Sequence, residues 1–423
     1  MTLRRLFQPL ATASLLAAGL LTSGCVDDVG QDGSDITDIN HTDVERQSIG
    51  NCWLYAQASW VESLNLTATG EAFDTSQSYW TYWHWFDQIK GGYTDEISTG
   101  GNQWTANSIV KKRGLMAELD FVPEDSVGEM SNRQKTALDA LNEELATGRL
   151  STPDERRDWA LIRDVMDDAW GLSPDVAAQL DEVFGEDGAE TLSDGASVGD
   201  THIVDPATFE AAYTRRSGDS VEWVETHLLQ AIDEWREADY PGSSWWDTTA
   251  TPEERRAFLK RVQLAMHDRQ PVVTTWNVDF NAMENDADSE LLGSFNMTTL
   301  AEAGGPGRQG GHKTVVEDYE ASTEEFGLLK AGETLDPNDP EDAAKLDALL
   351  LDSTEVVFVR IKNSWGSLRP DRGFAPGMPG YHDLYMDYMN GPIRWCPSVE
   401  EKTEENCTQM ATPFRTALLP PGY

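Results

Sequence analysis

Three reactive side chains lie far apart along this sequence, in segments of different kinds. Cys52 stands at the start of an apolar segment whose hydrophobic residues recur at helical spacing. His312 precedes the β-branched run 314–316, and Asn363 follows the β-rich run 356–361. Any fold that unites the three must bring the start of a helix against strands from a distant part of the chain.

The surroundings of Cys52 favour a nucleophilic role. Gly50 and Asn51 are typical of a turn that admits a helix, which would place the thiol on the first helical turn. Unpaired backbone N–H groups and the positive end of the helix dipole favour thiolate there. Taken alone, Cys52 fits an ordinary buried cysteine better than a nucleophile. The two distant motifs favour the nucleophile, because a thiol needs a base and a partner that holds the base in the correct tautomer.

Cysteine, histidine and asparagine in this order resemble the papain-like cysteine peptidase family. The segments that carry the resemblance are Gln47–Ala56, Gly310–Lys313 and Lys362–Gly366, and Gly100–Ala106 is similar to the family's Gly-Gly loop and the helix after it. The resemblance implies an α+β, two-lobed fold with a helical left lobe and a β-barrel-like right lobe. It also implies hydrolysis of peptide bonds through a thioester acyl-enzyme.

The family's catalytic roles carry over to four positions. Cys52 is the expected nucleophile, and His312 is the expected general base and acid. Asn363 is expected to accept a hydrogen bond from His312 and fix its ring, while Trp365 shields that bond from water.

Substrate binding is expected at the Gly-Gly loop. Gly100 and Gly101 would let a substrate backbone lie alongside in extended pairing, with Trp104 at the family's spacing. Paired glycines also occur in simple turns, so this reading rests on the neighbouring tryptophan.

The expected oxyanion donor is where the chain departs from the family. The family has glutamine six residues before the cysteine, but Arg46 occupies that position and Gln47 is five before. We favour Gln47 as the side-chain donor beside the Cys52 backbone N–H, with Arg46 as the alternative. Lys313 after the histidine is a further departure, and it alters the expected pocket for the substrate's second residue.

The composition is strongly acidic. The formal net charge is −42, from 74 acidic and 32 basic residues. Phosphate binding needs a basic surface, so nucleic acid is excluded as a default partner. We expect a peptide or protein substrate and a solvated acidic surface.

The first residues resemble a bacterial lipoprotein signal. Arg4 and Arg5 precede an apolar run, residues 10–21, which is too short to span a bilayer, and small residues then lead to Cys25. We expect Cys25 to be lipidated; plain secretion is the alternative, because Thr22 stands where such signals prefer leucine. The protein is therefore expected to be exported, as a cell-envelope lipoprotein at the outer membrane or cell surface or as a secreted protein, touching membrane only through lipid.

The remaining cysteines predict a disulfide rather than a metal site. Cys396 and Cys407 are close in sequence and are expected to pair in an exported protein. No cysteine–histidine cluster indicates zinc. The acidic loop 279–290 lacks a ligand and the turn glycine of a calcium loop, so we interpret it as a solvated loop. No metal and no cofactor are expected, and we expect a monomer.

The spacing of the motifs predicts an insertion. From Cys52 to His312 the chain runs 260 residues, against about 130–150 in the family. Helical periodicity at 133–150, 155–170, 175–184 and 221–237 predicts that the surplus is helical. The expected organisation is signal peptide 1–25, acidic disordered tether 26–42, helical lobe 43–124, helical insertion 125–250 and β-rich lobe 251–423.

Two other functions remain open from the sequence. The same cleft on a catalytically silent surface lipoprotein would bind a protein partner. An amidase or acyl transferase would use the same scaffold on other amides.

Overall fold

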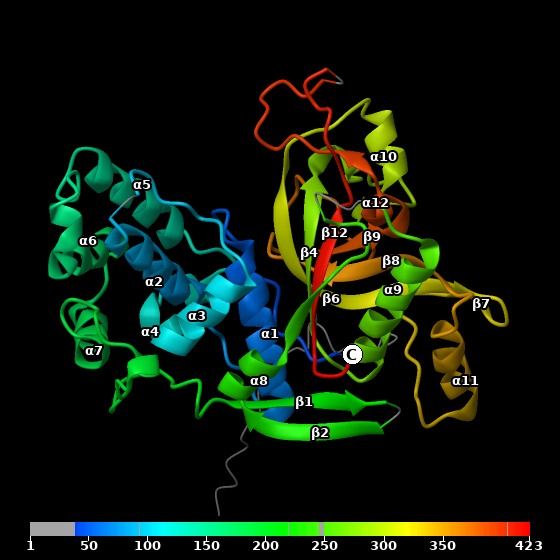
Figure 1. Cartoon of the computed structure of the whole chain (residues 1–423), viewed down its shortest axis with the longest axis horizontal. Coiled ribbons are helices and arrows are strands. Elements are labelled where there is room, and N and C mark those ends of the chain that lie inside the picture. Colours follow the sequence, from blue (N-terminus) through cyan, green and yellow to red (C-terminus); the bar gives the residue numbers. More distant parts are fainter. Residues whose placement is uncertain (1–38, 93, 219, 245–248, 404) are drawn as a thin grey trace, which may run out of the picture.

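The computed structural model describes residues 39–92, 94–218, 220–244, 249–403 and 405–423. The architecture is mixed α+β: helices from the first half of the chain gather on one side, and a large sheet from the second half lies on the other (Figure 1). The predicted signal peptide, Cys25 and most of the tether lie outside the described residues. Among the described residues, no helix is long and apolar enough to cross a membrane.

Helix α1 (Cys52–Thr69) lies between the helices and the sheet, and every residue from Cys52 to Asn65 except Ser59 is buried. Trp53, Trp60 and Leu64 are all buried, as a helix enclosed on all sides requires. It packs against β6 of the sheet and against α2 and α3. Gly70 ends it in the left-handed conformation, φ 72°. The start of this helix is therefore held at the junction of the two halves.

The helices on one side of α1 share a single hydrophobic core with it. They are α2 (Gln77–Lys90), α3 (Gln103–Arg113), α4 (Glu118–Phe121), η1 (Asp125–Val127), α5 (Arg133–Ala146), η2 (Glu155–Arg157), α6 (Trp159–Trp170), α7 (Pro174–Phe184) and η3 (Leu192–Asp194). The aromatic residues of α2 fill this core, with Trp80, Trp83 and Trp85 fully buried. They serve as core residues of this side of the molecule.

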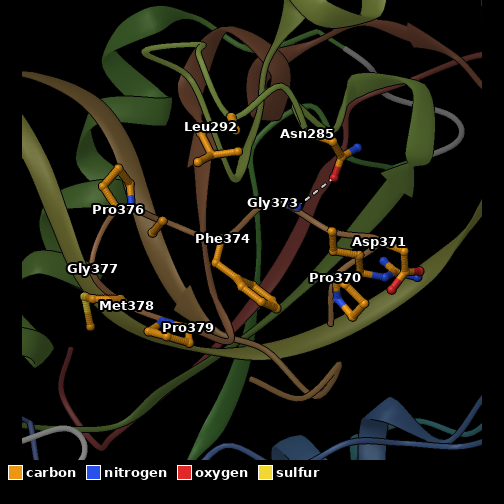
Figure 2. A pocket seen from close by; sticks show the side chains of 13 residues that line it. Asn285, Leu292, Pro370, Asp371, Gly373, Phe374, Pro376, Gly377, Met378 and Pro379 are labelled. Carbon is orange, nitrogen blue, oxygen red and sulfur yellow. Dashed lines mark hydrogen bonds between the residues drawn. The ribbon is translucent and has the colours of Figure 1, made fainter. Parts of the chain in front are cut away.

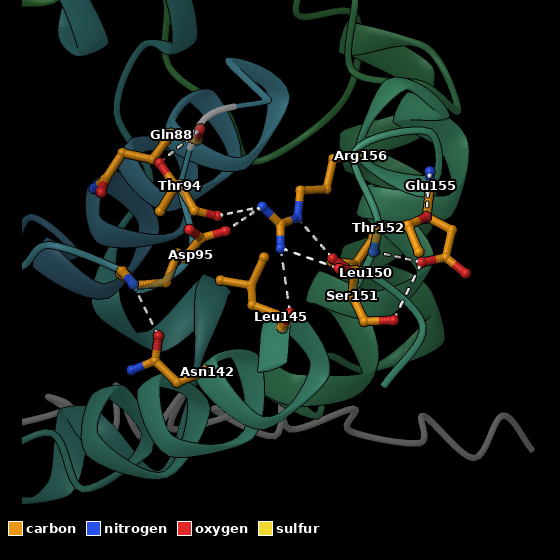
Figure 3. Close-up of polar contacts among 11 residues, drawn as sticks. Gln88, Thr94, Asp95, Asn142, Leu145, Leu150, Ser151, Thr152, Glu155 and Arg156 are labelled. Atoms are coloured by element: carbon orange, nitrogen blue, oxygen red, sulfur yellow. Dashed lines mark hydrogen bonds and ion pairs between the residues drawn. The ribbon is translucent and has the colours of Figure 1, made fainter. Parts of the chain in front are cut away.

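One buried arginine ties α5 and η2 to the loop that follows α2 (Figure 3). Arg156 donates to the carbonyls of Leu145 and Leu150 on its own side, at 3.2 and 2.7 Å. It also donates to the Thr94 carbonyl and the Asp95 carboxylate, at 2.8 and 3.0 Å. Segments 125–250 and 43–124 are thus joined by hydrogen bonds as well as by a common core.

The later part of the 125–250 segment differs from the helical prediction. It forms the hairpin β1 (Glu210–Ser217) and β2 (Ser220–His227), then α8 (Leu228–Glu234) and β3 (Arg236–Asp239). Helix was therefore the wrong prediction for residues 221–227. Valine, tryptophan and threonine favour an extended chain there, and pairing with β1 decides between the two. Strand β3 joins the main sheet beside β12, so this segment contributes to both halves of the molecule.

The main sheet has eight strands in the order β3-β12-β4-β6-β8-β9-β5, with β7 paired to β6. The strands from the second half are β4 (Val272–Asp279), β5 (Ser294–Phe295), β6 (Gln309–Thr323), β7 (Gly327–Leu329), β8 (Glu355–Lys362), β9 (Tyr381–Tyr385) and β12 (Phe414–Leu419), and β10 (Ile393–Arg394) pairs separately with β11 (Met410–Ala411). Val315 pairs with Lys362 across antiparallel β6 and β8, so the start of β6 lies beside the chain leaving β8. This register brings residues 312 and 363 together.

Short helices and α9 complete the second core, which the sheet dominates. They are α9 (Pro252–His267), η4 (Phe280–Ala282), α10 (Met297–Glu302), α11 (Pro340–Leu349) and α12 (Met386–Asn390). Thr251 and Glu254 form a capping box at the start of α9.

Residues 39–42, the end of the predicted disordered tether, are part of the fold. Ile39 is fully buried in the core beneath the sheet. His41 pairs with Glu317 of β6, Nε2 to Oε2 at 2.6 Å, with both side chains inaccessible. Burial of Ile39 and the contact between His41 and Glu317 outweigh the acidic, small-residue composition that predicted disorder.

Candidate active site

Cys52 is the first residue of α1 and is 8% exposed. The preceding residue, Asn51, uses its buried side chain to bond Thr81 of α2 and Gln134 of α5, at 3.1 and 2.9 Å. It therefore does not cap the helix with that side chain. Its amide therefore fixes where α1 begins.

The thiol of Cys52 lies against strand β6. Burial raises the pKa of the Cys52 thiol, while the backbone N–H and the positive charge of Lys313 act in the opposite direction. The sulfur is thus one residue along the strand from His312. Among the described residues, Cys52 and His312 share no hydrogen bond. Burial favours the neutral form of each group, since it raises the pKa of the thiol and lowers that of the imidazole.

His312 is held by Asn363 and Trp365. Its Nε2 lies 2.8 Å from Asn363 Oδ1. That oxygen can only accept, so Nε2 carries the proton and Nδ1 is the basic nitrogen. Trp365 stacks on the imidazole at 4.8 Å between centroids, with 19° between planes. Burial lowers the pKa of His312 to about 4, against the opposing effect of its bond to Asn363.

A second histidine, His382 of β9, holds the other end of the Asn363 amide. Asn363 Nδ2 lies 3.3 Å from His382 Nδ1, and because the amide nitrogen donates, Nδ1 must accept. His382 is fully buried, and burial lowers its pKa to about 3. With one end fixed by His382, the amide presents its oxygen to His312. The sequence gives no signal for this role beyond the alternation of the strand that carries His382.

Gln47 and Arg46 take different positions beside the site. The Gln47 amide donates from Nε2 to the Ile49 carbonyl at 2.7 Å and accepts from Ser364 Oγ at 2.6 Å. These two bonds fix its orientation and leave one N–H of Nε2 for another acceptor. Arg46 forms an isolated β-bridge with Trp365, and its side chain lies against Gly366.

The two glycines of the Gly-Gly loop differ in what they allow. A Cβ on Gly101 would lie 2.4 Å from the Trp53 indole, whereas one on Gly100 would meet only Ser98 Oγ at 3.8 Å. Trp53 also donates to the Thr99 carbonyl at 3.0 Å. The loop is therefore packed onto the residue that follows the nucleophile.

The start of α3 forms one wall of a pocket of about 520 Å³. Trp104 contributes a side chain that is 78% exposed. Lys313 points its buried ammonium to this side, donating to Gln103 Oε1 and Glu237 Oε1 at 2.9 Å each. The lysine thus places a charged, hydrogen-bonded group beside the thiol.

The remaining sequence predictions concern a disulfide and the absence of a metal site. Cys396 and Cys407 are bonded to each other, with Cα atoms 5.4 Å apart. Within the described ranges, no group of three or more histidine, cysteine or acidic residues is arranged to hold a metal ion.

Comparisons with known proteins find distant structural likeness only. No family model matches the chain, and no curated protein matches it in sequence. Xylellain, a cysteine protease from Xylella fastidiosa, is 13% identical over 92% of this chain and 86% of its own, with a TM-score of 0.34. Cwp84, a clostridial cysteine protease, is 10% identical over 90% of this chain and 54% of its own, with a TM-score of 0.26. At these scores the likeness does not establish a shared fold.

Proposed function

We propose that this protein is a cysteine peptidase of the papain-like kind, with two lobes that meet at α1. The observation that carries the proposal is the bond between His312 Nε2 and Asn363 Oδ1, made under the Trp365 ring. It selects the tautomer that a base needs, beside a thiol at a helix start. The sequence motifs around the same residues support the same function.

The reaction begins as a general-base step. His312 Nδ1 takes the proton of Cys52 as the sulfur bonds to the carbonyl carbon of the substrate. The tetrahedral intermediate collapses by breaking the C–N bond, and the imidazolium gives its proton to the leaving amine. Water then attacks the thioester while His312 takes one of its protons, and the departing sulfur recovers a proton.

The negative oxygen of each intermediate needs donors already in place. The backbone N–H of Cys52 supplies one at the start of α1, where it has no helical partner. The second N–H of Gln47 supplies the other. Gln47 is preferred over Arg46 because its amide is oriented by two bonds, while Arg46 lies along Trp365 and Gly366.

The test compares the wild-type protein with Cys52→Ala on a pool of denatured proteins. New peptide termini are expected with the wild type and none with the variant, whose melting temperature should match the wild type because only a sulfur atom is removed. Covalent labelling of Cys52 by a thiol-directed inhibitor should block cleavage. Cleavage by a folded Cys52→Ala protein would reject the proposal.

A binding function without hydrolysis is the competing proposal. The observation in its favour is the missing hydrogen bond between Cys52 and His312 in the resting site. A folded protein that is neither labelled at Cys52 nor able to cleave peptides would favour this alternative. Labelling with turnover of non-peptide amides alone would favour an amidase or acyl transferase.

We also propose that the protein is exported and lipidated at Cys25. The Cys396–Cys407 disulfide supports export, because such bonds persist outside the reducing cytosol. Mass spectrometry of the mature N-terminus is the test: a diacylated Cys25 is expected, and an unmodified terminus would indicate plain secretion.

A further inference from the structure

Three arginines lie near Trp365, which stacks on His312, and near Phe280, which stacks on Trp365. The guanidinium carbon of Arg372 lies 4.2 Å from the centre of the Trp365 ring and 5.0 Å from that of Phe280. Arg308 lies 4.1 Å from the same Phe280 ring. Arg46 runs beside Trp365 in an isolated β-bridge. These residues come from three separate segments, and the fold brings them to one place.

These three arginines have no carboxylate partner among the described residues. Nε and Nη1 of Arg372 and Nε of Arg46 are buried without a hydrogen bond. Neighbouring Arg369, by contrast, is held by both oxygens of Asp371. Leaving guanidinium donors buried and unpaired is costly, so the arrangement calls for an acceptor that arrives from outside.

The arginines also act on one another. Burial and the positive charges of Arg369, Arg308 and Arg46 together lower the pKa of Arg372 to about 10. Two carboxylates lie near the cluster in the described residues, and both are engaged by other groups. Asp371 is bonded to Arg369, and Glu129, which lies beside Arg46 at Gly366, accepts from the Ser367 N–H. An approaching anion would relieve both the repulsion and the unpaired donors.

The loop that carries Arg372, residues 370–379, is held in place by a contact with Asn285. Residues 370–379 line a pocket of about 550 Å³, and the Gly373 N–H donates to Asn285 Oδ1 at 2.8 Å (Figure 2). This bond holds the residue next to Arg372. The guanidinium is therefore presented at a set position rather than on a free loop.

We propose that this arginine cluster binds a carboxylate on the leaving-group half of the substrate. The inference rests on the proposed peptidase function. His312 must reach the leaving amine within hydrogen-bond distance, so the chain that departs passes the ring that Trp365 covers. Arg372 lies over Trp365, Arg308 over Phe280, which stacks on Trp365, and Arg46 pairs with Trp365, so the cluster borders the cover of that ring. Bidentate recognition of a carboxylate is what a guanidinium does best.

The carboxylate has two possible sources, and paired substrates distinguish them. A peptide that the enzyme cleaves is made with Glu or Gln just after the cleaved bond, with both ends blocked. A second pair has alanine there and ends two residues later in a free or an amidated C-terminus. An acidic side chain as the source predicts a preference in the first pair, and a free C-terminus predicts it in the second.

The preferred member should show kcat/KM roughly tenfold to a hundredfold above its uncharged partner. The ratio should fall in Arg372→Gln and in Arg308→Gln, of which Arg308 is exposed and its variant should fold normally. Arg157→Gln is the matched control: it removes the same charge from an exposed arginine paired with Asp154, and it should keep the ratio. Raising NaCl from ~0.05 to ~0.5 M should lower it.

Active enzyme with ratios near one in both pairs, or ratios unchanged in both cluster variants, would overturn the inference while leaving the peptidase function intact. Absence of hydrolysis would instead count against the proposed function. Binding then decides the inference: labelled Glu-containing and Gln-containing hexapeptides, and hexaalanine with a free or amidated end, are titrated against Cys52→Ala. Equal binding within both pairs overturns it, and a carboxylate preference lost on adding Arg308→Gln supports it.

Discussion

His312 is poised as a base by two asparagine bonds rather than by one. The Asn363 oxygen fixes the imidazole, and the Asn363 nitrogen is fixed in turn by His382. Burial keeps both rings neutral at physiological pH, because it lowers the pKa of His312 to about 4 and that of His382 to about 3. A neutral His312 can take the thiol proton at once.

The loss of kcat/KM on acidification should therefore occur well below the pH at which an ordinary histidine is protonated. Protonated His312 cannot accept the Cys52 proton, so kcat/KM should be half-maximal at about pH 4 and fall below that. Measuring kcat/KM from pH 3 to 8 checks this, with the unfolding transition followed over the same range. A half-maximum near pH 6.5 would mean that the ring is solvated in the working enzyme.

The two loop glycines make a matched pair of variants. Gly101→Ala sets a methyl group 2.4 Å from the Trp53 ring and should destabilise the protein by about 1–3 kcal/mol, since the indole has to move. It should also slow labelling of Cys52, which precedes that tryptophan. Gly100→Ala, with only an ordinary contact at 3.8 Å, is the control. Equal melting temperatures for the two variants would contradict this packing.

At the scale of elements, a buried polar relay joins α1 to β8. Lys362, at the end of β8, donates to Thr42 Oγ1 at 3.0 Å, and Thr42 donates to Glu62 of α1 at 2.5 Å. Lys362 and Glu62 are 5% and 4% exposed. Burial lowers the pKa of Lys362, and Glu62 is the first of the carboxylates that oppose this. Thr42 of the N-terminal segment thus links α1 to the end of β8, next to Asn363.

Removing one charged partner of this relay should strongly lower the free energy of unfolding. Lys362→Met leaves Glu62 buried without its cation and should cost ~3–5 kcal/mol of unfolding free energy. The double variant with Glu62→Gln should cost less than the sum of the two single variants. Chemical denaturation of all four proteins measures the coupling. Lys260→Met, which breaks an exposed pair with Asp352, should change little. Additive single effects would mean that the relay does not couple the elements.

The sequence predicts those elements whose pattern is long and regular. The helices α1, α5, α6 and α7 fall where periodicity indicates them, because residues of each are buried in a common core. Strand β2 does not, because its partner β1 determines its conformation. The roles of His382 and of the arginine cluster could not be predicted from the sequence either, since they depend on contacts with residues distant in sequence. Gln47 and Arg46 are named by the sequence, but their separate orientations come only from the fold.

For the whole molecule, the net charge of −42 is the dominant long-range term. Like charges over the surface repel one another and oppose compaction. Added salt shortens the screening length from about 30 Å at 0.01 M to about 8 Å at 0.15 M.

The melting temperature should therefore rise as NaCl increases from ~0.01 to ~0.5 M. The buried pair of His41 and Glu317 and the relay through Lys362 are shielded from solvent and should be little affected. Calorimetry over a salt series, with a neutral osmolyte as control, checks the sign. A fall in melting temperature would mean that surface ion pairs outweigh the net repulsion.

The proposed reaction requires Cys52 to form a covalent acyl-enzyme with the help of His312. Its most direct test is rapid acid quenching during turnover of a cleaved peptide, followed by intact and peptide mass spectrometry. We predict an added acyl group on the peptide that contains Cys52, with none in Cys52→Ala and greatly slowed formation in His312→Ala. Turnover with no adduct at Cys52, or an adduct on another residue, would contradict the account.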